Sequence, residues 1–334
     1  MRRFATAGLT GILAIALAAA PVAAQEEALD RIELPDGWAP EGITTDGSSL
    51  FAGSLADGAI WRADPMSGEG ELLAAGAEGR VAAGVEHDGF GRLWAAGGPT
   101  GEVRAYDADS GELLATYTLE AGFLNDIAAT DEAIYVTDSF MPQLVVIPLG
   151  EAGELPDAEA VTALPLSGDL VYGEGFNVNG IVAAPAGLIV VHSGNGQLFR
   201  IDPASGASSL IDSGDASLTG GDGLELDGDT LYVLRNTSNL VVALELDAAA
   251  ESAALLAEVT SDDFDVPTTM ALVGDDLWAV NARFGTEATP ETQYWITRVD
   301  APSSEMAEDG GDAEMEEMEA SPAAGMEASP APEG

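Results

Sequence analysis

Apolar positions recur along this chain with a period of about 43 residues. In each of six repeats a short apolar strand follows a small or polar two-residue tag. A second apolar run begins nine or ten residues after the first residue of the tag, and successive tags lie 42 to 54 residues apart. The tags are Glu41-Gly42, Ala83-Gly84, Asn125-Asp126, Asn179-Gly180, Asp222-Gly223 and Thr268-Thr269.

This spacing predicts an all-β protein, because it matches the length of one four-stranded propeller blade. The second run of each repeat is continuously apolar, as in Leu231–Leu234, which is typical of a strand covered on both faces. No segment of the repeat region shows the period of an amphipathic helix. The pattern therefore predicts a six-bladed β-propeller over residues 25–302.

The sixth repeat indicates how the ring closes. Its predicted strands cover residues 269–273, 277–281 and 294–299, and no outer strand follows them. Residues 29–34, which precede the first tag, alternate between apolar and polar side chains. We expect this N-terminal segment to form the outer strand of the last blade, because an open array would leave an exposed sheet edge.

The two ends of the chain differ in composition from the repeats. Residues 1–24 combine an arginine pair, an apolar run and small residues near a cleavage site, as in a signal peptide for export. A retained membrane anchor is the alternative, but the run is short and rich in Ala. Residues 303–334 are acidic and lack aromatic and β-branched side chains, which predicts a disordered tail. We therefore expect a secreted or periplasmic protein without a membrane span in its mature form.

Charge and cysteine content narrow the possible partners. The chain carries a net charge of −47 and contains no Lys, so nucleic acid and anionic lipid are excluded as partners. It has no Cys, which excludes disulfides and thiolate metal sites. An acidic surface of this kind also indicates adaptation to concentrated salt.

The first residues of the tags predict a metal site on the propeller axis. Inner strands line the central channel, so their first residues should face one another at one end. Four of these residues carry side-chain oxygens, namely Glu41, Asn125, Asn179 and Asp222. Carboxylate and amide oxygens suit Ca²⁺, although another divalent cation is possible. The alternative is that Asn-Gly and Asp-Gly are only turn dipeptides in an acidic chain.

A second set of polar residues is predicted near this ring. The second strand returns to the same end of the channel, and thirteen residues after the tags lie Asp138, His192, Arg235 and Asn281. We expect these side chains to surround a bound substrate. Asp126, beside Asn125, is expected to brace a neighbouring ligand through a hydrogen bond.

The order of Glu41-Gly42, Asn125-Asp126, Asn179-Gly180 and Asp222-Gly223 over six repeats resembles the SMP-30/gluconolactonase family. The resemblance covers about residues 36–300. It implies a catalytic Ca²⁺ held by the four tag residues, in a hydrolase of lactones or related esters. It also implies that Asp222 is both a ligand and the base or nucleophile.

One position departs from the family pattern. Phe123 stands where sugar-lactone hydrolases of this family often carry Arg, which favours a more apolar lactone or ester as substrate. Two other functions remain open from the sequence. The propeller could bind a small ligand or partner around a structural Ca²⁺ without catalysis, or the ring could be purely structural and serve salt tolerance.

Overall fold

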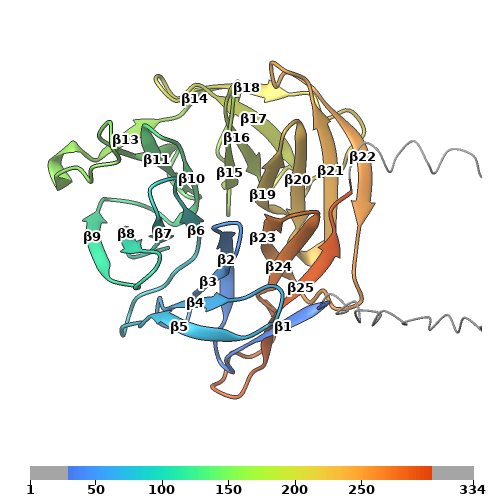
Figure 1. Cartoon of the computed structure of the whole chain (residues 1–334). Coiled ribbons are helices and arrows are strands. Elements are labelled where there is room, and N and C mark those ends of the chain that lie inside the picture. Colours follow the sequence, from blue (N-terminus) through green and yellow to red (C-terminus); the bar gives the residue numbers. More distant parts are fainter. Residues whose placement is uncertain (1–28, 303–334) are drawn as a thin grey trace, which may run out of the picture.

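The computed structural model describes residues 29–302 and shows six antiparallel sheets arranged as the blades of a ring (Figure 1). The predicted signal peptide (1–24) and acidic tail (303–334) lie outside the described residues. From the axis outward, blade 1 contains β2 (Pro40–Thr45), β3 (Leu50–Ser54), β4 (Ile60–Ala63) and β5 (Gly70–Ala74). Blade 2 contains β6 (Val85–His87), β7 (Arg92–Ala96), β8 (Glu102–Asp107) and β9 (Leu113–Thr118). Blade 3 contains β10 (Leu124–Ala129), β11 (Ala133–Asp138), β12 (Gln143–Pro148) and β13 (Thr162–Pro165).

The second half of the ring follows the same order. Blade 4 contains β15 (Val178–Ala184), β16 (Gly187–His192), β17 (Gln197–Ile201) and β18 (Ala207–Ile211), with the short β14 (Ser167–Gly168) parallel to β18 at its edge. Blade 5 contains β19 (Gly221–Asp227), β20 (Thr230–Arg235), β21 (Leu240–Leu246) and β22 (Ala253–Val259). Blade 6 contains β23 (Pro267–Val273), β24 (Asp276–Asn281), β25 (Tyr294–Asp300) and β1 (Arg31–Leu34). The prediction of an all-β, six-bladed propeller is confirmed.

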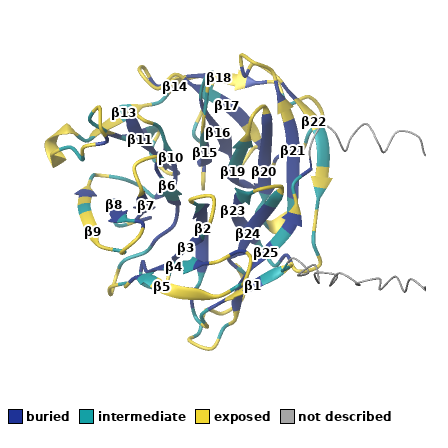
Figure 2. Ribbon diagram, in the orientation of Figure 1, coloured by how far each residue is buried: buried dark blue, intermediate teal, exposed yellow. Residues whose placement is uncertain are grey.

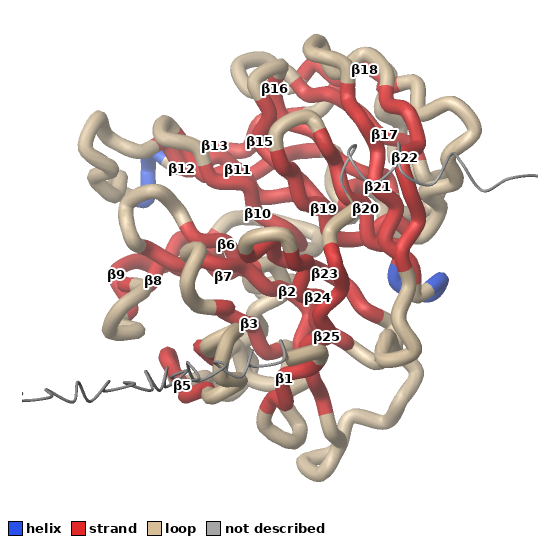
Figure 3. Tube along the Cα trace, turned by 45° about the vertical axis from the view of Figure 1, so that its right-hand side comes forward, coloured by secondary structure: helices blue, strands red, loops and turns tan. Residues whose placement is uncertain are grey.

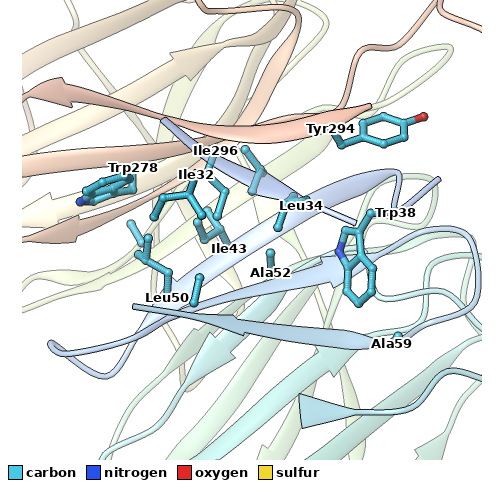
Figure 4. Packing of buried hydrophobic residues seen from close by; sticks show 13 residues of the cluster. Ile32, Leu34, Trp38, Ile43, Leu50, Ala52, Ala59, Trp278, Tyr294 and Ile296 are labelled. Atoms are coloured by element: carbon cyan, nitrogen blue, oxygen red, sulfur yellow. The ribbon is translucent and has the colours of Figure 1, made fainter. Parts of the chain in front are cut away.

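The N-terminal strand closes the ring, as predicted. β1 pairs antiparallel with β25, and Ile32 lies opposite Ile296. Ile32 and Leu34 are buried in a cluster that joins the last blade to the first, together with Trp278 and Leu50 (Figure 4). The sheet edge that an unclosed array would expose is thus covered by a strand from the other end of the chain.

Burial follows the order of strands within each blade. The second strands are almost wholly buried, because a neighbouring blade covers each face, whereas outer strands such as β5 and β13 are largely exposed (Figure 2). Within residues 29–302, helical structure is confined to two 3₁₀ turns, η1 (Ala158–Ala160) and η2 (Asn236–Ser238), coloured blue in Figure 3. No helix in this part of the chain has the length and apolar character needed to cross a membrane.

The tags form β-bulges at the start of the inner strands. In blades 1, 3, 4, 5 and 6 the pairing between the first and second strands shifts at the tag, as between Pro40 and Ile43 of β2. Bulges re-aim side chains and commonly lie beside active sites. A Cβ on Gly42 would lie 2.2 Å from the carbonyl oxygen of Ala83 in the next tag. The glycine therefore lets neighbouring inner strands approach closely at the axis.

Candidate functional site

The four predicted ligand residues line one cavity at the tag end of the channel. The cavity has a volume of about 270 Å³. Glu41, Asn125, Asn179 and Asp222 come from the inner strands of blades 1, 3, 4 and 5, which surround the axis in Figure 1. The other lining residues are Leu55, Phe123, Phe176, Ser193, Asn236 and Phe284. The ring of oxygen-bearing side chains expected from the sequence is thus brought together in space.

Serine side chains orient both asparagine amides. Ser139 Oγ donates to the carbonyl oxygen of Val178 and accepts a 3.0 Å hydrogen bond from Asn125 Nδ2. Ser193 Oγ in the next blade donates to the Gly221 carbonyl oxygen and accepts a 3.2 Å hydrogen bond from Asn179 Nδ2. Since each serine proton is already committed to a carbonyl oxygen, each amide must present its nitrogen to the serine.

This orientation leaves the two amide oxygens available. Among the described residues, neither Oδ1 of Asn125 nor Oδ1 of Asn179 accepts a hydrogen bond. Free carbonyl oxygens beside carboxylates are ligands that Ca²⁺ favours.

Asp222 is held through both of its carboxylate oxygens. Oδ1 accepts a 2.6 Å hydrogen bond from Asn179 Nδ2, and Oδ2 accepts a 2.8 Å hydrogen bond from Asn236 Nδ2. Burial raises the pKa of Asp222 to about 7, with the charge of Asp126 acting in the same direction and the two amide donors opposing it. The carboxylate is therefore fixed in orientation, yet costly to ionise without a further positive charge.

Glu41 is a second buried carboxylate that is costly to ionise. Burial raises the pKa of Glu41 well above its usual range, and the charges of Asp222 and Asp126 raise it further. No Arg or His side chain lines the cavity. Two buried carboxylates without a cationic partner favour either a bound proton or a bound cation.

The donor set fits a hard divalent cation. It consists of two carboxylates and two amide oxygens. Within residues 29–302 there is no metal site formed by three or more His, Asp or Glu side chains. Ca²⁺ accepts mixed ligands of this kind and completes its shell with water or substrate oxygen. Glu41, Asn125, Asn179 and Asp222 are the residues that would hold it.

The predicted second set of polar residues lies outside the cavity lining. Asp138, His192, Arg235 and Asn281 pair directly across from the residue that precedes each tag, as Leu124 pairs with Asp138. Paired residues point to the same face of a sheet, whereas consecutive residues point to opposite faces. Their side chains therefore turn away from the tag side chains.

These four side chains instead hold the surrounding loops. Buried Asp138 accepts hydrogen bonds from the backbone N–H groups of Gly122, Phe123, Phe140 and Met141. His192 Nδ1 accepts from the Gly194 N–H at 3.2 Å, and burial lowers the pKa of His192. Arg235 Nε donates to the Thr219 carbonyl oxygen, and Asn281 Oδ1 accepts from the Asp265 N–H.

The residues that contact the tags lie one position further along the chain. Ser139, Ser193 and Asn236 each follow a tag by fourteen residues, and each forms a hydrogen bond with the tag residue of its own blade. Leu55 occupies the same position in blade 1 and lines the cavity. The repeat spacing predicts position thirteen instead, and the extra residue of the bulge moves the contact to position fourteen.

In the described part of the chain the Asp126 carboxylate forms no hydrogen bond with Glu41, Asn125, Asn179 or Asp222, contrary to the prediction. It accepts hydrogen bonds from the backbone N–H groups of Ile127 at 2.9 Å and Ile181 at 3.3 Å, and so joins blades 3 and 4. It lines a deeper cavity of about 200 Å³ together with Glu86 and Glu225. Burial raises the pKa of both Asp126 and Glu225 to about 7. The bulge explains the difference, because it turns the second tag residue down the channel.

Phe123, predicted as a substrate contact, lies in an aromatic cluster in the cavity wall. Its ring centroid is 5.4 Å from that of Phe176 and 6.3 Å from that of Phe140. Phe140 and Phe176 lie 4.8 Å apart, and both are about 45% exposed. Exposed aromatic rings beside a ring of polar side chains are suited to contact the apolar part of a ligand.

Comparisons with known proteins support the fold alone. A scan against protein-family models and a search of curated proteins found no match. The major allergen Mala s 1 of Malassezia sympodialis has a TM-score of 0.64 at 17% identity, covering 82% of this chain and 97% of the allergen. Virginiamycin B lyase of Staphylococcus aureus has a TM-score of 0.54 at 14% identity, covering 75% of this chain and 80% of the lyase. The WD40 repeats of RRP9 have a TM-score of 0.55 at 12% identity, covering 80% of this chain and 97% of the repeat domain. These proteins differ in function, so the activity must be argued from the site.

Proposed function

We propose that this propeller is a Ca²⁺-dependent hydrolase of a small lactone or related ester. The observation that carries the proposal is the convergence of Glu41, Asn125, Asn179 and Asp222 on one cavity that contains two buried carboxylates and no cationic side chain. The resemblance of these tag residues to the SMP-30/gluconolactonase family supports the same function. One structural neighbour is a lyase, so propellers of this kind accommodate catalysis.

Each protein group has a role in this proposal. When bound, the cation would supply Lewis-acid polarisation of the substrate carbonyl. Asp222 would act as base toward water or as nucleophile, since hydrogen bonds at both oxygens fix its carboxylate in the cavity. Ser139 and Ser193 would keep the amide oxygens turned toward the cation. Phe123 and its neighbours would contact the apolar part of the substrate.

The test compares chelator-treated and Ca²⁺-supplemented protein on a panel of lactones and esters. We expect hydrolysis only with the cation, and a loss of about 10²- to 10⁴-fold in kcat/KM for Asp222→Asn. Asp229→Asn is the matched control, because Asp229 is exposed in the turn between β19 and β20 of the same blade.

Two outcomes would contradict the hydrolase. Activity that is unchanged by chelation and by Asp222→Asn would exclude the proposed chemistry. Calcium-dependent thermal stability without turnover of any lactone or ester would instead support a binding propeller with a structural ion.

A further inference from the structure

A second, larger cavity adjoins the candidate site. It has a volume of about 630 Å³ and lies between the segment that connects β1 to β2 and the loop that connects β24 to β25. Leu55 and Phe284 line both cavities, so they form the common wall. A ligand at the carboxylate ring therefore has this second cavity directly beside it.

The walls of the second cavity are mainly small and apolar. They include Ala39, Ala56, Ala282, Ala288 and Pro290. Phe284 is 49% exposed, although it is a large aromatic residue at the junction of the two cavities. An apolar surface of this kind beside a polar reaction centre is typical of a site that takes the hydrocarbon part of a ligand.

The one cationic residue in the wall is already paired. Arg283 Nε donates a 2.7 Å hydrogen bond to Asp265 Oδ2, and its guanidinium lies 4.9 Å from the centre of the Trp295 ring. Arg283 Nη1 donates to the Gln293 carbonyl oxygen at 2.7 Å. The guanidinium is thus held by contacts at the base of the loop. It is therefore not available to pair with an anionic ligand in the cavity.

The cavity is built by contacts between its two walls. The Gly37 N–H donates a 2.7 Å hydrogen bond to the Thr292 carbonyl oxygen, which ties the segment before β2 to the β24–β25 loop. Gly37 has φ of +75°, and a Cβ there would lie 3.0 Å from Pro290 Cα. Thr292 Oγ1 also donates to the Glu287 carbonyl oxygen within the loop. These contacts hold the two walls in place before any ligand binds.

We propose that this second cavity binds the hydrocarbon chain of an uncharged lactone or ester whose carbonyl group lies at the carboxylate ring. This inference rests on the proposed hydrolase function and specifies its substrate class. Buried carboxylates and a net charge of −47 disfavour anionic substrates, whereas the shared wall of Leu55 and Phe284 provides an apolar path between the cavities.

The first arm of the test measures chain-length dependence. On γ-lactones with alkyl chains from none to six carbons, kcat/KM should rise about fourfold for each added methylene, the ratio that corresponds to about 0.8 kcal/mol per buried CH₂. Ala288→Trp, in the β24–β25 loop, and Ala56→Trp, in the turn between β3 and β4, each add bulk to the cavity lining. Each should lower kcat/KM for the longest chain at least tenfold. Ala248→Trp, in the exposed turn after β21, should leave the rise intact.

The second arm does not require turnover. The neutral fluorescent probe N-phenyl-1-naphthylamine should bind the chelator-treated protein, and γ-decalactone should displace it. Ala288→Trp should weaken probe binding at least tenfold, whereas Ala248→Trp should not change it.

The two arms separate the two proposals. Probe binding that Ala288→Trp weakens, without hydrolysis of any lactone, would support the chain site and contradict the hydrolase. Lactone hydrolysis that is insensitive to chain length, or probe binding equal in Ala288→Trp and Ala248→Trp, would overturn the chain site.

Discussion

Asn179 Nδ2 donates a 2.6 Å hydrogen bond to Asp222 Oδ1 and thereby joins the inner strands of blades 4 and 5 at the candidate site. The two residues lie 43 positions apart and occupy the same place in successive repeats. Ser193 fixes the amide from one side, and Asn236 fixes the carboxylate from the other. Hydrogen bonds within and between successive repeats therefore set the geometry of the ring.

Removal of a serine hydroxyl should weaken cation binding without unfolding the propeller. Ser193→Ala and Ser139→Ala each remove the acceptor that orients an asparagine amide, so we expect Ca²⁺ affinity to fall about 10- to 100-fold. Each should also reduce the free energy of unfolding by about 1–2 kcal/mol. Calorimetric titration with Ca²⁺ and chemical denaturation measure the two effects.

Ser209→Ala is the control for these variants, because Ser209 lies exposed on β18 of blade 4. Equal Ca²⁺ affinity in Ser193→Ala and Ser209→Ala would show that the amide orientation does not matter for binding.

Without the cation, the protein should become less stable as the pH rises. Burial raises the pKa of Asp222 to about 7, from a usual value near 3.8, and raises that of Glu41 as well. The folded state thus holds protons that the unfolded state has released. The resulting stability is present below about pH 4 and is lost as the pH rises toward 7 and above. For Asp222 the change is of the order of a few kcal/mol.

Denaturation of chelator-treated protein between pH 4 and 8 measures this dependence. Asp222→Asn should reduce the slope, because the amide does not titrate, and added Ca²⁺ should remove much of it in the wild type. Asp229→Asn is again the control. A slope that is equal in Asp222→Asn and Asp229→Asn would show that Asp222 ionises without cost.

Ring closure should contribute strongly to stability. Ile32 is 1% exposed and lies in the cluster that joins blades 6 and 1 (Figure 4). Ile32→Ala should lower the free energy of unfolding by about 2–5 kcal/mol, the range for large-to-small changes in a core. Glu33→Gln, on the exposed face of the same strand, should cost less than about 1 kcal/mol. Equal effects in urea denaturation would mean that β1 is not needed to close the ring.

Salt and calcium should stabilise the protein in different ways. The net charge of −47 makes the surface repel itself, so Tm should rise gradually as KCl increases from 0.1 to 2 M. Calcium should instead act at micromolar to millimolar concentrations, at one saturable site that Glu41→Gln weakens. Differential scanning calorimetry in 2 M KCl, with and without Ca²⁺, separates the effect of calcium from that of salt. The absence of any effect of Ca²⁺ at high salt would favour a purely structural acidic ring.

The sequence alone is sufficient to predict the fold and the meeting of four tag residues at one cavity. The repeat spacing predicted six blades, and the missing outer strand of the sixth repeat predicted that residues near Ile32 close the ring. Both features are local patterns of apolar side chains, which the structure confirms. The tags were recognisable because glycine and side-chain oxygens recur at equivalent positions, and their first residues necessarily meet on the axis of a propeller.

Only the tertiary structure decided which neighbouring side chains face that ring. A strand exposes alternate residues on opposite faces, so a shift of one position separates Asp138, which holds loops, from Ser139, which orients Asn125. The bulge at each tag sets this register, and it also turns Asp126 down the channel. The second cavity depends on contacts between Gly37 and Thr292, which lie far apart in the chain. Periodicity determines which residues meet on the axis, whereas backbone irregularities and long-range contacts determine how the side chains around them point.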